Sequence, residues 1–209
     1  MPYVCLLLSG AALLVNGLAT LGRLPRRDAA VLSVVVGGIQ LALAVVHLGV
    51  SSAAPLLTAA GMFLFGLTYV YVGLDVLLGL GSRGVGWFCG MVAFVGVLLA
   101  AAWLGSDPLL AVLWLAWAAL WALLFMASGL GCGRLEPLTG WALVLLSQPT
   151  TTVPAVLGIA GIWPGHPQAA WLAAAVVAAL FVLARGLARR VGVAPGPART
   201  AGTAGSPGR

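Results

Sequence analysis

The sequence predicts an all-α integral membrane protein that crosses a bilayer about seven times. Hydrophobic residues make up 62% of the 209 residues and charged residues only 7%. The mean hydropathy is +1.14. A soluble domain of this size cannot hide so much apolar surface. Apolar runs of about 20 residues, the length that crosses a hydrocarbon core, fill the chain and leave no room for a soluble domain.

The candidate spans are 3–21, 29–49, 56–78, 86–104, 109–130, 139–161 and 168–188. The first span is interpreted as a membrane helix rather than a cleaved signal peptide, because it lacks a basic start and contains Asn16. The last span is the least regular, since Arg185 interrupts it. Ala169–Val182 alone is short for a full crossing, although an arginine near a helix end can reach the interface.

The arginines predict the orientation. With seven spans, all of them fall on one side, at Arg23, Arg26, Arg27, Arg83, Arg134, Arg185, Arg189, Arg190, Arg199 and Arg209. Positive residues stay in the cytoplasm, so we expect the N-terminus outside and the C-terminus inside. The net charge of +6 then indicates contact with anionic lipid and not with nucleic acid. The Pro- and Gly-rich segment 191–209 is predicted to be a disordered cytoplasmic tail.

Aromatic residues gather at the middle of two predicted spans. Trp114, Trp117 and Trp121 recur at i, i+3 and i+7 and therefore share one helix face. Phe65 and Tyr69 share a face of the third span, with Thr68 beside them. Trp103 and Trp163, in contrast, are assigned to the interfacial aromatic belt. Packing between helices is the alternative explanation for the central rings.

Uncharged polar residues lie at the same depth. Asn16 continues a stripe on the first span that includes Leu6, Ser9 and Leu13. Gln148, Thr151 and Thr152 share a face of the sixth span. Pro149 and Pro154 in that span free backbone carbonyls, which at this depth must be buried in protein or face a watery cavity. Gln40 is interpreted as a partner in interhelical hydrogen bonds.

Several functional classes are excluded by what the spans lack. No charged side chain lies near the predicted midplane, which argues against an ion pathway or a proton-driven pump. Neither a phosphate-binding motif, nor a metal-ligand pattern, nor a catalytic triad occurs, so no enzyme activity, metal or cofactor is expected. An aromatic, uncharged and modestly polar lining instead suits a flat, neutral solute.

Two long motifs resemble the AmiS/UreI family of small-amide and urea channels. The segment Gly61–Tyr71 (GMFLFGLTYVY) resembles the family pattern GxxxFGxTYxY, and Trp114–Trp121 (WLAWAALW) resembles WLxWxxLW. Shorter similarities occur at Asn16-Gly17, Gly37-Gly38, Gly86-Trp87-Phe88, Thr139-Gly140-Trp141 and Thr151–Pro154. The resemblance covers residues 1–161 in order.

The resemblance implies a six-helix channel domain over 1–161, built from two inverted three-helix repeats. The additional transmembrane helix over 168–190 is predicted from the last apolar run and lies outside the family pattern. It also implies a homo-hexamer in which each protomer has its own pore. With the polar residues singled out above, the expected pore lining is Leu6, Ser9, Leu13, Asn16, Phe65, Thr68, Tyr69, Trp114, Trp117, Leu120, Trp121, Gln148 and Thr151.

The sequence departs from the family in three places. The family commonly has a glutamate where this chain has Leu146. The acid-gated urea channel of the family has a long, histidine-rich loop between spans 2 and 3, which is only about six residues here. The seventh span is extra. We therefore expect a passive channel for urea or short-chain aliphatic amides in the bacterial inner membrane, supplying a cytoplasmic urease or amidase. The alternative is a seven-helix membrane sensor or assembly protein that keeps the fold without conducting.

Overall fold

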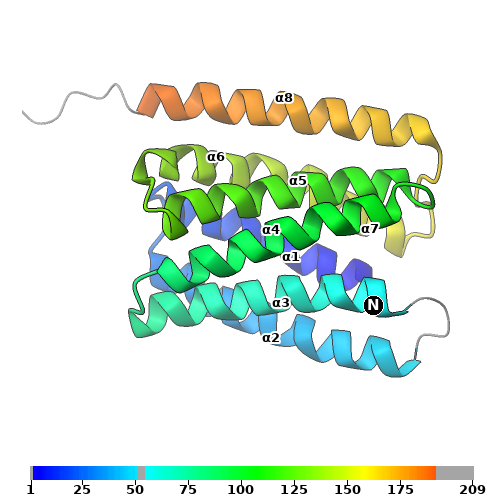
Figure 1. Cartoon of the computed structure of the whole chain (residues 1–209), viewed down its shortest axis with the longest axis horizontal. Helices are drawn as coiled ribbons and strands as arrows, with labels where there is room; N and C mark the ends of the chain where they lie inside the picture. Colours follow the sequence, from blue (N-terminus) through cyan, green and yellow to red (C-terminus); the bar gives the residue numbers. More distant parts are fainter. Residues whose placement is uncertain (1, 51–54, 192–209) are drawn as a thin grey trace, which may run out of the picture.

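The computed structural model describes residues 2–50 and 55–191, and every regular element in these two stretches is a helix (Figure 1). Within them, seven helical segments are long and apolar enough to cross a membrane. The predicted fold class, an all-α multi-pass membrane protein, is therefore confirmed. Of the tail predicted over 191–209, Val191 ends the last helix and the rest lies outside the described residues.

The predicted spans correspond to the observed helices with small shifts at their ends. The last long helix extends three residues beyond the predicted span, past Arg185, to Val191. The long helices are α1 (Pro2–Thr20), α2 (Arg26–Val50), α3 (Pro55–Leu78), α4 (Arg83–Trp103), α5 (Pro108–Leu124), α6 (Glu136–Ser147), α7 (Val153–Ile159) and α8 (Pro167–Val191).

The sixth crossing is not one regular helix. A π-helical turn, η3 (Gln148–Thr152), joins α6 directly to α7. A second π turn, η1 (Phe125–Gly129), ends α5, and a short 3-10 turn, η2 (Gly133–Leu135), leads into α6. Pro149 and Pro154 explain the irregularity in part, since neither can donate a backbone hydrogen bond to the preceding turn.

The loops divide the bundle into an arginine-rich end and an arginine-free end. The α1–α2, α3–α4 and α5–α6 connections and the end of α8 lie together at the left of Figure 1. At this end the Arg23 guanidinium lies 5.1 Å from the centre of the Trp141 ring. The Arg26 and Glu136 side chains lie 4.0 Å apart. The α4–α5 and α7–α8 connections and the start of α1 lie at the opposite end.

Glycines allow the helices to approach closely at two crossings. A Cβ atom on Gly17 of α1 would lie 2.9 Å from the Gly140 carbonyl oxygen of α6. A Cβ atom on Gly37 of α2 would lie 2.6 Å from the Gly66 carbonyl oxygen of α3. Both distances are too short for a carbon atom, so glycine is required at these contacts. Small residues serve this purpose generally in membrane helix packing.

α5 lies in the interior of the bundle and α8 at its edge. Most side chains of α5 are buried, including all three tryptophans. α8 packs on α5 and α6 along one side of the molecule (Figure 1). Small side chains, Ala170 and Ala184, are buried on α8, whereas Trp171 and Val182 are more than 70% exposed. The centre of the molecule is therefore made by α1, α3, α5 and the segment from α6 to α7.

Candidate permeation pathway

Four aromatic rings from α3 and α5 meet in the centre of the bundle. The Phe65 ring centre lies 6.0 Å from that of Trp114, 5.1 Å from that of Trp117 and 4.7 Å from that of Trp121. Trp114 also contacts both other indoles, with Trp117 edge to face at 5.2 Å and Trp121 stacked at 6.4 Å. All four side chains are buried. Phe65 and Trp114 each contact all of the other rings.

The π turn in the sixth crossing fixes one of these indoles. The Trp117 Nε1–H donates to the Thr150 hydroxyl at 3.2 Å. The Thr150 hydroxyl in turn donates to the Leu146 carbonyl at 2.7 Å. Thr150 lies within η3, directly after Pro149. The irregular turn therefore has a specific role, because it presents a hydroxyl acceptor to a buried indole.

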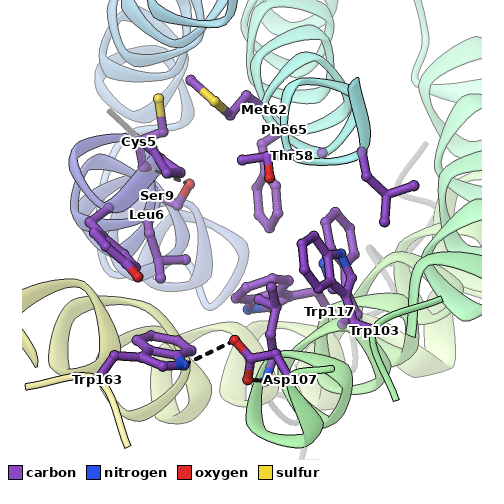
Figure 2. Close-up of a pocket in the computed structure, with 16 residues that line it drawn as sticks. Cys5, Leu6, Ser9, Thr58, Met62, Phe65, Trp103, Asp107, Trp117 and Trp163 are labelled. Atoms are coloured by element: carbon purple, nitrogen blue, oxygen red, sulfur yellow. Dashed lines mark hydrogen bonds between the residues drawn. The ribbon is translucent and has the colours of Figure 1, made fainter. Parts of the chain in front are cut away.

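Two cavities lie on opposite sides of this aromatic cluster. The large cavity has a volume of about 290 Å³, and its lining side chains are drawn in Figure 2. Trp103, Asp107 and Trp163 in this lining place it towards the arginine-free end. Its walls are Pro2, Tyr3, Cys5, Leu6, Ser9, Leu57, Thr58, Gly61, Met62, Phe65, Trp103, Asp107, Leu110, Trp114, Trp117 and Trp163. The small cavity, of about 100 Å³, extends towards the arginine-rich end. Its walls are Leu13, Asn16, Thr20, Phe65, Thr68, Tyr69, Val72, Trp117, Leu120, Trp121, Leu124 and Leu143.

Phe65 and Trp117 line both cavities and therefore form the wall between them. Their rings meet edge to face, with an interplanar angle of 85°. A solute that moved from one cavity to the other would have to pass these two rings. The large cavity is also just below the roughly 300–1,000 Å³ that is typical of sites for drug-sized ligands, so it suits a small solute.

Most of the residues predicted from the sequence lie on this pathway. Leu6, Ser9 and Trp114 line the large cavity, and Phe65 and Trp117 line both cavities. Leu13, Asn16, Thr68, Tyr69, Leu120 and Trp121 line the small cavity.

Gln148 and Thr151 are the exceptions, because neither lines a cavity. Gln148 is exposed on the outside of the bundle. Thr151 is fully buried, donates to the Ser147 carbonyl and faces Gly10 of α1. The prediction for these two residues assumed the geometry of a regular α-helix. The π turn changes the rotation per residue from Gln148 onward, and the assumed shared face does not exist there.

Three polar side chains of the small cavity already use their donors. Thr68 donates to the Leu64 carbonyl at 2.7 Å, and Tyr69 donates to the Ser9 carbonyl at 3.3 Å. The Asn16 Nδ2 group donates to the Ala12 carbonyl and to the Ser33 hydroxyl, both at 2.8 Å. What these side chains offer a solute is therefore oxygen lone pairs, which accept hydrogen bonds.

Three indole groups remain as donors. Within the described residues, no hydrogen bond through Nε1 is found for Trp103, Trp114 or Trp121. Trp103 and Trp114 line the large cavity, and Trp121 lines the small one. The pathway thus combines flat aromatic faces with several acceptors and a few N–H donors. A primary amide needs this combination, since it carries two N–H groups and one carbonyl on a flat frame.

Gln40 and Leu146 lie beside the pathway without lining it. Gln40 is fully buried, and its Nε2 group donates to the Cys5 carbonyl and the Ser9 hydroxyl at 2.8 Å. This agrees with its predicted role in interhelical hydrogen bonding. Leu146, at the position where the family commonly has a glutamate, is also fully buried and lines neither cavity.

The mouth of the large cavity is not predicted from the sequence. Trp103 and Trp163 line this mouth, although their positions predict an interfacial belt. Asp107, in the α4–α5 connection, lies there too. An aspartate before a proline at a helix start indicates only an N-cap, so the sequence held no signal for its position at a cavity.

The described part of the chain holds no group of three or more His, Cys, Asp or Glu side chains that could bind a metal ion. Asp75, a buried acidic residue near the end of α3, accepts hydrogen bonds from the Ser82 backbone N–H at 2.9 Å and the Ser82 hydroxyl at 2.6 Å. Asp75 thereby fixes the α3–α4 loop and lines neither cavity.

Comparison with known proteins places these features in a family context. Residues 1–162 match the AmiS/UreI family of transporters. A Rhodococcus erythropolis protein named as the transporter AmiS2 is 44% identical over 205 residues, covering 94% of this chain and 98% of that protein. A Mycolicibacterium smegmatis protein named as a transporter of amidate substrates is 36% identical, covering 93% of this chain and 95% of that protein.

A solved structure is similar as well. The crystal structure of the urea channel from Helicobacter pylori superposes with a TM-score of 0.68 at 28% identity. The match covers 78% of this chain and 100% of the urea channel. The two transporters therefore match nearly the whole of this chain, whereas the urea channel leaves part of it unmatched.

Proposed function

This chain is a member of the AmiS/UreI family of membrane transporters, and from that premise we propose that it is a passive channel for small planar amides. Short-chain aliphatic amides are the main permeants in this proposal, and urea is a smaller one of the same shape. Members of the family are channels and transporters, not enzymes.

One observation carries the proposal: the two cavities share Phe65 and Trp117 as their common wall. A flat solute can lie against the ring faces on either side of this wall. Its N–H groups can donate to the free lone pairs of Thr68 and Tyr69, and its carbonyl can accept from Trp114 or Trp121. Binding sites on both sides of a narrow point are what conduction requires.

The absence of charge along the pathway supports a passive mechanism. The small cavity is lined only by uncharged side chains, and the large cavity contains a single charged residue, Asp107, at its mouth. An ion that left the large cavity would lose its hydration without a compensating charge. Coupled carriers rely on ionisable groups inside the membrane, and the described walls offer none between the two cavities.

The extent of the similarities favours amides over urea. The two relatives that match this chain over more than 90% of its length are named as transporters, one of them for amidate substrates. The urea channel matches only 78% of it. The sequence similarity between this chain and the two transporters thus extends into α8. In this proposal the channel lies in the bacterial inner membrane, supplies a cytoplasmic amidase or urease, and assembles as a homo-hexamer with one pore per protomer.

The proposal is tested by solute flux into proteoliposomes that contain the purified full chain. We expect stopped-flow light scattering to show rapid entry of acetamide, measurable entry of urea, and glycerol entry no faster than in empty liposomes. Glycerol is similar in size but lacks the flat frame. Equal rates for acetamide with and without protein, in vesicles where size-exclusion chromatography shows intact protein, would contradict the proposal.

A non-conducting membrane sensor or assembly protein is the alternative function. It is favoured by the close contacts between the Phe65 and Trp117 rings, which separate the cavities. The same flux experiment discriminates the two functions. A sensor would bind amides in the large cavity and change tryptophan fluorescence, but would carry no solute across the vesicle.

A further inference from the structure

The mouth of the large cavity holds a carboxylate in a fixed orientation. Asp107 precedes α5 as its N-cap, and its Oδ1 atom accepts from the Leu110 backbone N–H at 3.0 Å. The Oδ2 atom accepts from the Trp163 Nε1–H at 3.0 Å (Figure 2). Both oxygens are thus held by one donor each. A carboxylate has about four lone-pair positions, so Asp107 retains acceptor capacity towards the cavity that it lines.

No positive side chain neutralises this carboxylate within the described residues. The ion pair that the structure shows there, Arg26 with Glu136, lies at the opposite end of the bundle. The described arginines also lie towards that end, in the connections, at the starts of α2 and α4, or in the last two turns of α8. Asp107 therefore places a negatively charged side chain at the entrance to a mostly aromatic chamber.

Aromatic rings surround the space in front of Asp107. Tyr3 and Trp163 form a ring pair with their centres 5.6 Å apart. Trp103, Trp114 and Trp117 line the same cavity. Aromatic faces attract cations, with indole the strongest, and a carboxylate binds flat N–H cations by charge-assisted hydrogen bonds. The cavity combines both elements.

We propose that the large cavity binds small planar cations of the amidinium and guanidinium class. These ions have the flat shape of amides and urea, with the carbonyl oxygen replaced by a further N–H group. Their N–H groups can donate to the free lone pairs of Asp107 while the ring faces cover the charged plane. The bound ion would stay in the large cavity, because the wall and the small cavity offer it no negative charge.

A consequence follows for transport, and it rests on the proposed function. A cation in the large cavity occupies the space through which an amide must pass. Amidinium ions are therefore competitive blockers of amide flux from the arginine-free side.

Trp163 is a positioning residue for this site. Its indole N–H holds Asp107, and its ring pairs with Tyr3. Trp163 lies just beyond residue 162, where the match to the transporter family ends. The connection that leads to α8 thus contributes directly to the cavity mouth, in addition to joining α8 to the bundle.

Binding is tested on the detergent-purified full chain by tryptophan fluorescence during titration with acetamidinium chloride. Sodium chloride at equal ionic strength is the comparison salt. We expect saturable quenching at millimolar acetamidinium and none with sodium. Asp107→Asn keeps an N-cap side chain but removes the charge, and should weaken binding about tenfold, as expected for a loss of 1.4 kcal/mol. Glu136→Gln, which removes an exposed carboxylate at the opposite end, should leave binding unchanged.

Trp163→Phe gives a second, independent test, since it keeps a ring beside Tyr3 but removes the N–H that holds Asp107. We expect weaker acetamidinium binding than in the wild type, though stronger than in Asp107→Asn. Acetamide flux into proteoliposomes is measured in parallel, with acetamidinium added outside, and should fall as the cation site fills.

The two proposals can fail separately. Saturable acetamidinium binding that depends on Asp107, together with no acetamide flux into proteoliposomes, would uphold the cation site and overturn the channel. Rapid acetamide flux that acetamidinium does not inhibit, together with no fluorescence change, would overturn the cation site alone. Binding that is the same in Asp107→Asn as in the wild type, or equal binding of sodium, would also overturn it.

Discussion

Trp117 connects the permeation pathway to the irregular part of the fold. Its ring lines both cavities, and its Nε1–H donates to Thr150 in the π turn. A buried indole N–H without a partner is costly, so this bond favours a single ring position. The ring position in turn determines the gap beside Phe65. One hydroxyl on the sixth crossing therefore controls the geometry of the wall between the cavities.

Thr150→Val tests this connection. The variant keeps the side-chain shape but leaves the Trp117 N–H without its acceptor, at a cost of about 1–3 kcal/mol in the free energy of unfolding. We expect a lower melting temperature and a changed ratio of acetamide to butyramide flux, because the indole is no longer fixed.

The matched control is Thr139→Val. Thr139 is equally buried and also donates to a carbonyl four residues earlier, that of Leu135 at 2.9 Å, but it accepts from no indole and lines neither cavity. The control should lose some stability and keep the flux ratio. An identical flux ratio in wild type and Thr150→Val would show that the bond does not set the pathway.

A substitution at Trp121 tests whether the aromatic cluster lines a permeation pathway or only packs between helices. Its ring lies 4.7 Å from that of Phe65 and lines the small cavity. Trp121→Ala should widen the pathway and raise the flux of larger amides relative to acetamide. Removing a buried Trp ordinarily costs about 3–5 kcal/mol. Because one side of this ring faces a cavity rather than packed side chains, we expect the protein to remain folded and assembled.

Leu113→Ala is the comparison variant on the same helix. Leu113 is 1% exposed and lines neither cavity, so its truncation costs about 2–5 kcal/mol without touching the pathway. Size-exclusion profile, thermal stability and liposome flux are measured on both variants. If Trp121→Ala lost stability as Leu113→Ala does and kept normal solute selectivity, Trp121 would be a packing residue.

At the scale of the helix, the sequence predicts where crossings are but not how regular they are. Apolar runs of about 20 residues locate the spans because the bilayer thickness fixes their length. The spacing of Trp114, Trp117 and Trp121 predicts a shared face correctly because α5 is regular there. Gln148 and Thr151 were misplaced because they lie in a π turn. Pro149 signals an irregularity, but tertiary contacts with Trp117 select which irregularity forms.

The residues at the mouth of the large cavity could not be predicted from the sequence to lie together. Tyr3, Asp107 and Trp163 come from three distant parts of the chain and meet only in the folded bundle. Each has an ordinary local explanation, as an interfacial aromatic or as an N-cap. Their joint role depends on the packing of helix ends, which no periodicity within one span encodes.

The length and charge of α8 predict the orientation of the chain in the membrane. It has 25 residues, about 37 Å of helix at 1.5 Å per residue, which exceeds the roughly 30 Å of a hydrocarbon core. Arg189 and Arg190 lie in its last turn, at the arginine-rich end. We therefore predict that α8 crosses the membrane, with the N-terminus outside and the C-terminus inside. A reporter that works only in the cytoplasm should be active when it is fused to the C-terminus. A C-terminal fusion active only outside the cell would show that α8 does not cross.

The charge distribution of the whole molecule predicts how flux responds to pH. Acid gating in this pH range generally relies on histidine side chains, and the sequence has two, His47 and His166. Neither histidine lines a cavity. His166 is exposed in the α7–α8 connection, and His47 lies in the last turn of α2.

The walls of the two cavities contain no histidine on which acidification could act. We therefore predict acetamide flux that varies by less than about twofold between pH 5 and pH 7.5, measured in proteoliposomes with the same buffer on both sides. The double variant His47→Gln and His166→Gln should give the same flat profile. A several-fold increase in flux at pH 5 that this double variant abolished would mean that protonation at the arginine-free end opens the pathway, and would reverse the conclusion that the walls alone determine conduction.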